Sequence, residues 1–192
     1  FDFDKLPEKN INIGFPSSEN SICTLDSVER KLNSSNLLIK DGQTPIAVAG
    51  VIGGKNTEVD VNTKNIFIES ALFNPIVIRK SAKSLDVSTD ASKRYERSVD
   101  PNMARTAIDI LTGLIIKYAG GKSCSDLVES GSITNDNHDI KFNVSDCNKF
   151  LGTNLDNEKI ESIFKKLNIS FSKKDSIYRC APPSYRAHDI CR

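Results

Sequence analysis

The chain has 192 residues, 38% of them apolar, which is enough for one large or two small domains with a buried core. Its 26 Lys and Arg against 25 Asp and Glu give a formal net charge of +1. This charge lacks the long-range positive field of a bulk nucleic-acid binder, so contacts with phosphates must be local and no DNA partner is expected. The longest apolar runs fall far short of the ~18 residues that cross a bilayer, which excludes a membrane partner and predicts a soluble globular protein.

The cysteine count and the two ends of the chain add two expectations. An odd number of widely spaced cysteines is typical of reduced thiols in a cytosolic protein rather than of a disulfide scaffold. They are Cys23, Cys124, Cys147, Cys180 and Cys191. The chain starts FDFDKL without Met and stops at HDICR after a strand-like run, so we expect an excised piece of a longer chain.

Residues 1–70 show a β pattern. Short β-branched runs alternate with turn formers, as in Asp41-Gly42, and predict a mixed or antiparallel sheet. The predicted strands are SICTL, NLLIK, PIAVAGVI and NIFIES.

Two cap-plus-proline signals predict helices after this sheet. Asn74-Pro75 opens a helix of about ten residues with a basic polar face. Asp100-Pro101 opens a longer one, whose apolar residues recur at helical spacing until Gly120-Gly121. Residues 122–139 are rich in Ser, Gly, Asn and Asp and read as a partly structured linker, with a domain boundary near 135.

A smaller unit is predicted beyond the linker. It has a strand at IKFNV, a helical turn started by Ser145, a helix opened by Asp156, and strands at NISFS and SIYRCA. The fold class is thus α+β: a mixed or antiparallel sheet with packed helices, followed by a small, incomplete α+β domain. At about 55 residues, the second unit is marginal for independent stability.

The glycine-rich run GVIGGKNT does not match the sequence pattern of a phosphate-binding loop. That loop needs Gly, four residues, Gly-Lys and then Ser or Thr, but position 49 is Ala and Asn56 follows Lys55. Two interpretations stay open: a tight turn after a buried strand, or a place where Gly53 and Gly54 let a ligand approach the backbone.

Metal and nucleophile chemistry have little support. His138 and His188 are not paired at ligand spacing and no CxxC occurs, so a zinc site is not indicated. A catalytic triad would need one of these two histidines, and both are better explained as exposed side chains.

Glu69 and Thr89 are the most informative polar residues. Alternation along IFIES places Glu69 on one face with Phe67, where a carboxylate either pairs with Arg94 or Arg97 or points into a pocket. Thr89 or Asp90 reads as a helix cap, although the free amides there could also hold an oxygen-rich ligand.

These blocks resemble a known family. The order LDSVERKL, PIAVAGVIGG, TKNIFIESALFNP, IRKSAK and STDASKRYERSVDP, followed by FLGTNLDNEKIESIFKKLNISF and PPSYRAHDI, is similar to the beta chain of bacterial phenylalanyl-tRNA synthetase. The resemblance runs through nearly the whole chain. It assigns residues 1–130 to the editing module, meaning the third and fourth beta-chain domains without their N-terminal part, and 139–192 to the start of the fifth.

The resemblance implies a division of labour. The intact enzyme is an alpha2-beta2 heterotetramer in the cytoplasm that uses ATP and Mg²⁺ to join phenylalanine to its tRNA. That synthesis belongs to the alpha chain, so no cofactor is expected in this chain. The expected partners are the 3′ end of the phenylalanine tRNA and the alpha chain.

The same resemblance implies an editing site that hydrolyses mischarged tyrosyl-tRNA. A site that only tolerates an extra hydroxyl discriminates by about 10², so a second site that prefers the hydroxyl is useful. Glu69 would accept the phenol hydrogen bond, Gly53 and Gly54 would leave space for the ring, Ala91 would keep the wall small, and Thr89 would position the ester. The catalytic assignment rests on Thr89 and Glu69, with an ordered water in place of a nucleophile.

Three departures from the family pattern bear on this assignment. A pocket His of the family would precede Phe1, so editing by this chain is expected to be weakened. Family glycines are Ser27 and Ser98 here. One extra residue lies between Arg186 and Asp189, and Asp189 matches the first of a set of acidic Mg²⁺ ligands that would be complete only with residues beyond Arg192. The alternative function is a non-catalytic tRNA-binding and subunit-assembly module.

Overall fold

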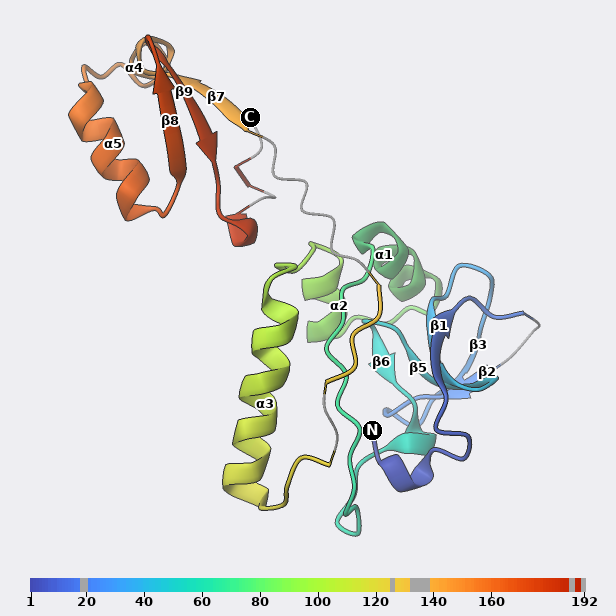
Figure 1. The fold of residues 1–192 in the computed structure, drawn as a ribbon. Coiled ribbons are helices and arrows are strands. Elements are labelled where there is room, and N and C mark those ends of the chain that lie inside the picture. The colour runs from blue at the N-terminus through green and yellow to red at the C-terminus, as the bar shows by residue number, and fades with distance from the viewer. Residues whose placement is uncertain (18–20, 125–126, 132–138, 187–188, 191–192) are drawn as a thin grey trace. The chain divides into compact units, whose positions relative to one another are not determined.

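The computed structural model describes residues 1–17, 21–124, 127–131, 139–186 and 189–190. It divides into two compact units (Figure 1). Unit 1 comprises Phe1–Val99 with Met103–Asp126, and unit 2 comprises Asp100–Asn102 with Leu127–Arg192. Every strand pair among the described residues is antiparallel and helices accompany the sheets, which confirms the α+β fold class.

Unit 1 holds a four-stranded sheet of order β1-β4-β5-β6 and a separate β2-β3 pair. Its strands are β1 Ile11–Gly14, β2 Ser21–Cys23, β3 Glu29–Lys31, β4 Leu38–Asp41, β5 Thr44–Val48 and β6 Ile52–Gly53. Its helices are the 3₁₀ turns η1 Phe3–Lys5 and η2 Lys55–Thr57, and the α-helices α1 Pro75–Ser84, α2 Asp90–Tyr95 and α3 Met103–Ala119.

The β4–β5 hairpin carries the core of unit 1 on both faces. Leu38 and Val48 are paired and pack with Ile78 of α1, while Ile39 and its partner Ala47 pack with residues of the N-terminal segment. Successive side chains of a strand point to opposite faces, so two small cores share one hairpin. This hairpin turns at Asp41-Gly42 as the sequence predicts.

Two predicted strands are interrupted. The run 45–52 is not one strand, because the chain turns at Gly50, which has φ +64°, and β6 folds back onto β5. The run 65–70 is not a regular strand either. It forms a single bridge, between Ile66 and Asp2, flanked by two hydrogen bonds between the main chains of Phe67 and Phe1. The pairing stops there because the partner segment turns into the 3₁₀ helix η1 at Phe3.

The predicted helix caps of α1 and α2 are confirmed. Asn74 Oδ1 accepts hydrogen bonds from the amides of Ile76 and Val77 at the start of α1. Thr89 and Ser92 form a reciprocal capping box at the start of α2. Both helices therefore begin where local chemistry places them.

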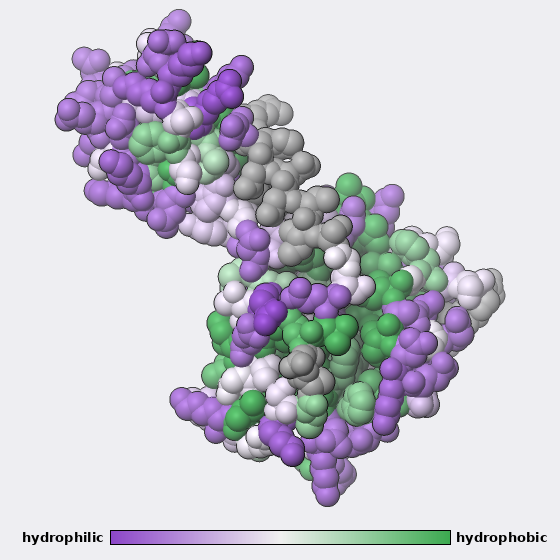
Figure 2. All heavy atoms as spheres, in the orientation of Figure 1, coloured by the Kyte–Doolittle hydropathy of each residue, from purple (hydrophilic) through white to green (hydrophobic). Residues whose placement is uncertain are grey.

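Helix α3 begins at Met103, two residues beyond the predicted Asp100-Pro101 signal, and ends before Gly120 with φ +76°. None of its residues is buried, and a row of large apolar side chains is exposed. This row, the α3 stripe, consists of Met103, Ile110, Leu111, Leu114 and Tyr118. Figure 2 shows hydrophobic side chains gathered on the visible face of unit 1.

Unit 2 is a three-stranded sheet of order β7-β9-β8 with two helices. Its core includes Tyr178, fully buried on β9, and Phe164 of α5, whose ring centroids lie 5.8 Å apart. Asp156 caps α5 as predicted, whereas the cap of α4 is Asn143 and not Ser145. The elements are β7 Ile140–Asn143, α4 Val144–Leu151, α5 Asn157–Lys166, β8 Ser170–Lys174, β9 Ile177–Ala181 and the 3₁₀ turn η3 Ser184–Arg186.

Two further findings concern the part of the chain that the structure describes. No helix there has the length and apolar character needed to cross a membrane. Its four cysteines, at positions 23, 124, 147 and 180, are free thiols, and Cys191 lies outside the described residues.

Candidate functional site

Glu69 lies in an irregular segment in which the next two residues each make a hydrogen bond to a helix. Ser70 Oγ donates to the carbonyl of Ala104 in α3 over 2.7 Å. The Tyr95 hydroxyl of α2 donates to the carbonyl of Ala71 over 3.2 Å. The backbone that follows Glu69 is thus held to two helices, to α3 by its own Ser70 side chain and to α2 by the Tyr95 side chain, although it belongs to no regular strand.

The carboxylate of Glu69 has no hydrogen bond or ion pair with any residue that the structure describes, and neither Arg94 nor Arg97 pairs with it. Its side chain is partly buried, and burial raises the pKa of Glu69, with the α-amino group of Phe1 acting in the opposite direction. An acid that lacks a protein donor can accept a hydrogen bond from a ligand. The ion-pair interpretation of Glu69 was therefore wrong.

Thr89 is held at the start of α2. Its Oγ1 donates to the carbonyl of Val51 over 2.6 Å and accepts from the amide of Ser92 over 3.0 Å. One lone pair of the hydroxyl oxygen is left for a further donor. The capping interpretation of Thr89 is confirmed, while its place beside a substrate ester stays a prediction.

Gly53 and Gly54 differ in what surrounds them. A Cβ on Gly54 would lie 2.6 Å from the carbonyl oxygen of Ile46 and 2.5 Å from Asn56 Oδ1. A Cβ on Gly53 would meet only the flexible end of Leu25, at 3.0 Å. The packing of β5 accounts for Gly54 without a ligand, whereas Gly53 is partly exposed and its predicted contact with a substrate ring stays a prediction.

Helix α2 links the predicted site residues. Its first residues reach the turn that precedes Gly53, its last residue lies within the electrostatic reach of Glu69, and Ala91 is exposed on its first turn. Burial raises the pKa of Tyr95, and the charge of Glu69 raises it further.

The sequence analysis did not single out Tyr95, Phe73 and Gly50. The rings of Phe73 and Tyr95 lie 5.3 Å apart, and a Cβ on Gly50 would come within 3.0 Å of Phe73 and 3.3 Å of Tyr95. The available signals were the glycine in PIAVAGVI and the aromatic residues inside TKNIFIESALFNP and STDASKRYERSVDP.

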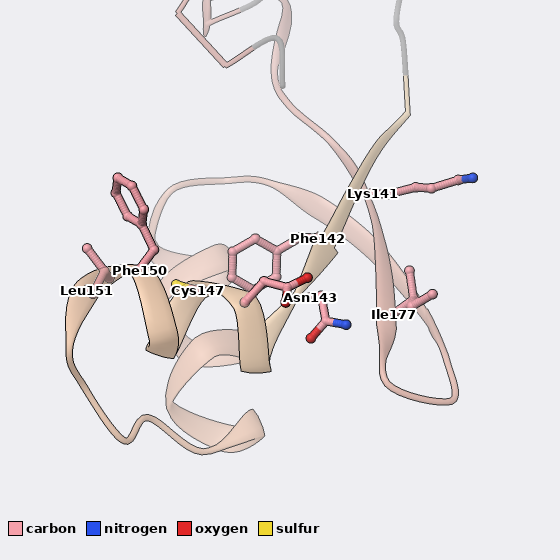
Figure 3. A pocket seen from close by; sticks show the side chains of 8 residues that line it. Lys141, Phe142, Asn143, Cys147, Phe150, Leu151 and Ile177 are labelled. Carbon is pink, nitrogen blue, oxygen red and sulfur yellow. The ribbon is translucent and has the colours of Figure 1, made fainter.

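A groove in unit 2 contains none of the predicted site residues. Its volume is about 560 Å³, and Figure 3 shows Phe150 and Leu151 of α4 with Lys141 of β7 and Ile177 of β9 along it. The described lining is mainly apolar, and its charged residues are Lys141 and Asp146. No metal-binding group of His, Cys, Asp or Glu is found there among the described residues.

The described residues do not fit a metal ion. They contain no group of three or more His, Cys, Asp or Glu that could hold one. Asp189 accepts hydrogen bonds from Arg186 Nε over 2.8 and 3.1 Å and forms an ion pair with the same guanidinium. His138 and His188 lie outside the described residues.

Unit 1 also carries exposed basic side chains on α1 and α2, which together are called the basic face. Arg79, Lys80 and Lys83 of α1 and Lys93 and Arg94 of α2 are exposed, and none of them forms an ion pair with a described residue. The two helices contact each other.

Comparisons with known proteins identify the class of both regions. The B3/4 domain family matches residues 1–120, and the tRNA synthetase B5 domain matches residues 140–192. The chain belongs to the B3/4 domain family and continues into a B5 domain.

The relatives define a particular subunit. Proteins named phenylalanine–tRNA ligase beta subunit are 38% identical to this chain in Protochlamydia amoebophila and Fusobacterium nucleatum, over 97% and 100% of the chain. The one from Halalkalibacterium halodurans is 32% identical over 97% of it. The predicted resemblance to the beta chain of phenylalanyl-tRNA synthetase is confirmed, and the chain spans about a quarter of the length of these relatives, 23% or 24%.

Proposed function

We propose that unit 1 is an editing module that hydrolyses tyrosine wrongly esterified to the tRNA for phenylalanine. The observation that carries this proposal is Glu69: a partly buried carboxylate without a donor or an arginine partner among the described residues. A carboxylate left unpaired in a region of partial burial is unfavourable for folding and is characteristic of functional sites.

The chemistry matches the ligand. A phenol donates a hydrogen bond that phenylalanine cannot offer, and a site built around such a bond discriminates strongly against the analogue without it. Gly53 and Ala91 would form the wall next to the ring, because neither projects a large side chain, while Gly54 packs against the carbonyl of Ile46 in β5. Thr89 would stand near the ester.

The reaction needs no covalent intermediate. The oxygen of a water molecule attacks the ester carbonyl carbon, the bond from that carbon to the ribose oxygen breaks, and a proton from the water passes to the ribose oxygen. Free tyrosine and uncharged tRNA leave. An aminoacyl ester is already activated, so positioning of water and substrate supplies the catalysis.

The wider setting is part of the proposal. The family relationship supports a place in a cytoplasmic heterotetramer with a catalytic alpha chain, where ATP and Mg²⁺ serve aminoacylation. Magnesium has no ligand set among the described residues, so no step of the proposed hydrolysis uses it.

Glu69→Gln tests the editing function, in the full natural protein that carries this sequence. Glutamine keeps the shape and can still meet the hydroxyl, but it removes the charge, so we expect release of tyrosine to slow by about 10- to 100-fold. Release of phenylalanine from its own tRNA should not change. If Glu69→Gln and Glu69→Ala both released tyrosine at the wild-type rate, the proposed role of Glu69 in editing would be excluded.

A second candidate function is a non-catalytic module that binds tRNA and assembles with the alpha chain. The basic face of α1 and α2 and the α3 stripe favour it. The double variant Lys80→Glu with Lys83→Glu should weaken tRNA binding. It should also reduce the slope of log K against log salt concentration by about one for each phosphate contact that is lost.

The matched control for this charge reversal is Lys165→Glu with Lys166→Glu in the last turn of α5. Robust tyrosine release by wild-type protein would exclude the purely non-catalytic alternative. Equal salt dependence of both double variants would exclude the basic face as the phosphate contact.

A further inference from the structure

Helix α2 makes a side-chain contact to the main chain at each of its two ends. Thr89 Oγ1 donates to the carbonyl of Val51 over 2.6 Å, and the Tyr95 hydroxyl donates to the carbonyl of Ala71 over 3.2 Å. Val51 lies two residues before Gly53, and Ala71 lies two residues after Glu69. Each contact therefore holds the backbone next to one predicted site residue.

The helix that makes these contacts is itself fixed. The capping box of Thr89 and Ser92 locks its start, with Ser92 buried. Its end is fixed by the Tyr95 ring, which packs on Phe73 and against Gly50 in the core cluster of Ile78 and Val51. Because an α-helix has a fixed rise per residue, a short helix held at both ends keeps its two contacts at a fixed distance from each other.

The two segments that α2 holds are irregular in part. Residues 67–74 form no regular strand or helix, and residues 49–51 are a turn. Gly53 pairs with Ala47 of β5, and Ser70 Oγ joins the Glu69 segment to the carbonyl of Ala104 in α3. Helix α2 contacts both segments and so links them to each other, and irregular segments with fewer such links fluctuate more than packed elements.

We propose that Thr89 and Tyr95 are positioning residues. Through the carbonyls of Val51 and Ala71 they set the separation between Glu69 and Gly53. This inference rests on the proposed editing function. It assigns to Tyr95 a role in the site and gives Thr89 a different one: its proton goes to Val51, so Thr89 cannot donate to the ester carbonyl.

The direction of the Tyr95 hydroxyl has a second consequence. A phenol close to Glu69 could satisfy that carboxylate from within the protein. Because its proton goes to Ala71, Glu69 is left to a donor from the substrate. Burial, and after it the charge of Glu69, raises the pKa of Tyr95, so the hydroxyl stays protonated and keeps this hydrogen bond at neutral pH.

The test uses Tyr95→Phe and Thr89→Val, which remove the two hydroxyls and keep the shapes, in the full natural protein that carries this sequence. The single-turnover rate of tyrosine release should fall by about 10-fold in each variant. KM from steady-state assays should stay within about two-fold, because misplacement affects the reaction more than binding. Thr89→Ser restores the hydroxyl and should restore the rate. The matched controls are Tyr118→Phe and Thr106→Val, both on the exposed surface of α3.

Glu69→Gln in the same assay separates this inference from the editing function. If Glu69→Gln releases tyrosine slowly while Tyr95→Phe and Thr89→Val release it at the wild-type rate, the positioning roles are overturned and the proposed editing function stands. Loss of thermal stability without a change in the rate of folded protein would also overturn them, since it indicates a purely structural role. Slow release by both variants, with rescue by Thr89→Ser, supports the proposal.

Discussion

Each unit of the protein places a glutamate close to a tyrosine, but only in unit 2 does the tyrosine hydroxyl donate to the glutamate. In unit 2 the Tyr178 hydroxyl donates to Glu161 Oε1 over 2.7 Å, with Lys173 Nζ 3.9 Å from the same oxygen. In unit 1 the Tyr95 hydroxyl donates to a main-chain carbonyl and Glu69 has no donor among the described residues. One carboxylate is satisfied by the fold, and the other is available.

The difference shows what a binding site requires. The Glu161–Tyr178 contact is the hydrogen bond between carboxylate and phenol that Glu69 is proposed to make with a tyrosine ligand. Where the protein supplies both partners, the bond stabilises a small domain. Where it supplies only the acceptor, the unfavourable burial of Glu69 is offset when a ligand with a phenol binds.

The largest effect should come from truncating the tyrosine of unit 2. Tyr178 is fully buried and its ring lies within 6.4 Å of the rings of Phe142, Phe164 and Phe171. Tyr178→Ala should lower the free energy of unfolding of unit 2 by about 3–5 kcal/mol, because it opens a cavity in a small core. Near-ultraviolet circular dichroism during thermal denaturation would show unit 2 melting first. A loss below about 1 kcal/mol would contradict its central role.

A smaller effect distinguishes two adjacent glycines of unit 1. Gly54→Ala forces a Cβ against the Ile46 carbonyl and should lower the free energy of unfolding by about 3 kcal/mol. Gly53→Ala needs only a movement of Leu25, so it should cost less than about 1 kcal/mol. Urea denaturation of both variants measures the difference. Equal losses would mean that Gly53 is also required by packing.

The hydroxyls of the two tyrosines give a direct comparison of the pairs. Tyr178→Phe removes a hydrogen bond to a charged acceptor and should lower the free energy of unfolding by about 2 kcal/mol, whereas Tyr95→Phe removes one to a neutral carbonyl and should cost about 1 kcal/mol. Urea denaturation is the measurement, and the exposed Tyr118→Phe is the control. A greater loss for Tyr95→Phe would reverse the comparison.

Much of this arrangement follows from local sequence. The caps at Asn74, Thr89 and Asp156 and the turn at Asp41-Gly42 were predicted because their chemistry depends on neighbouring residues. The irregular path of residues 65–70 was not, since it depends on pairing with Phe1 and Asp2, more than sixty residues away. Alternation alone favours a strand wherever apolar residues alternate.

The candidate site was predictable to a similar degree. The resemblance led to Glu69, Thr89 and the two glycines, but it could not show which glycine the packing requires, nor that α2 contacts the backbone beside both parts of the site. Those contacts join residues 24 and 38 positions apart. The ion pair expected for Glu69 failed because charge spacing in a sequence does not determine where side chains point.

The smallest effect on stability belongs to Glu69, and its sign is the most informative. Burial raises the pKa of Glu69 above its value in the unfolded chain, so its contribution to stability is fully present below the unfolded pKa and is lost as pH rises through the folded one. Glu69→Gln removes this loss, and near pH 7 it should raise the free energy of unfolding by about 1 kcal/mol or less. Glu161→Gln weakens a satisfied bond and should lower it. Urea denaturation between pH 4 and about pH 7 measures both variants, and a destabilised Glu69→Gln would show that the fold itself uses this carboxylate.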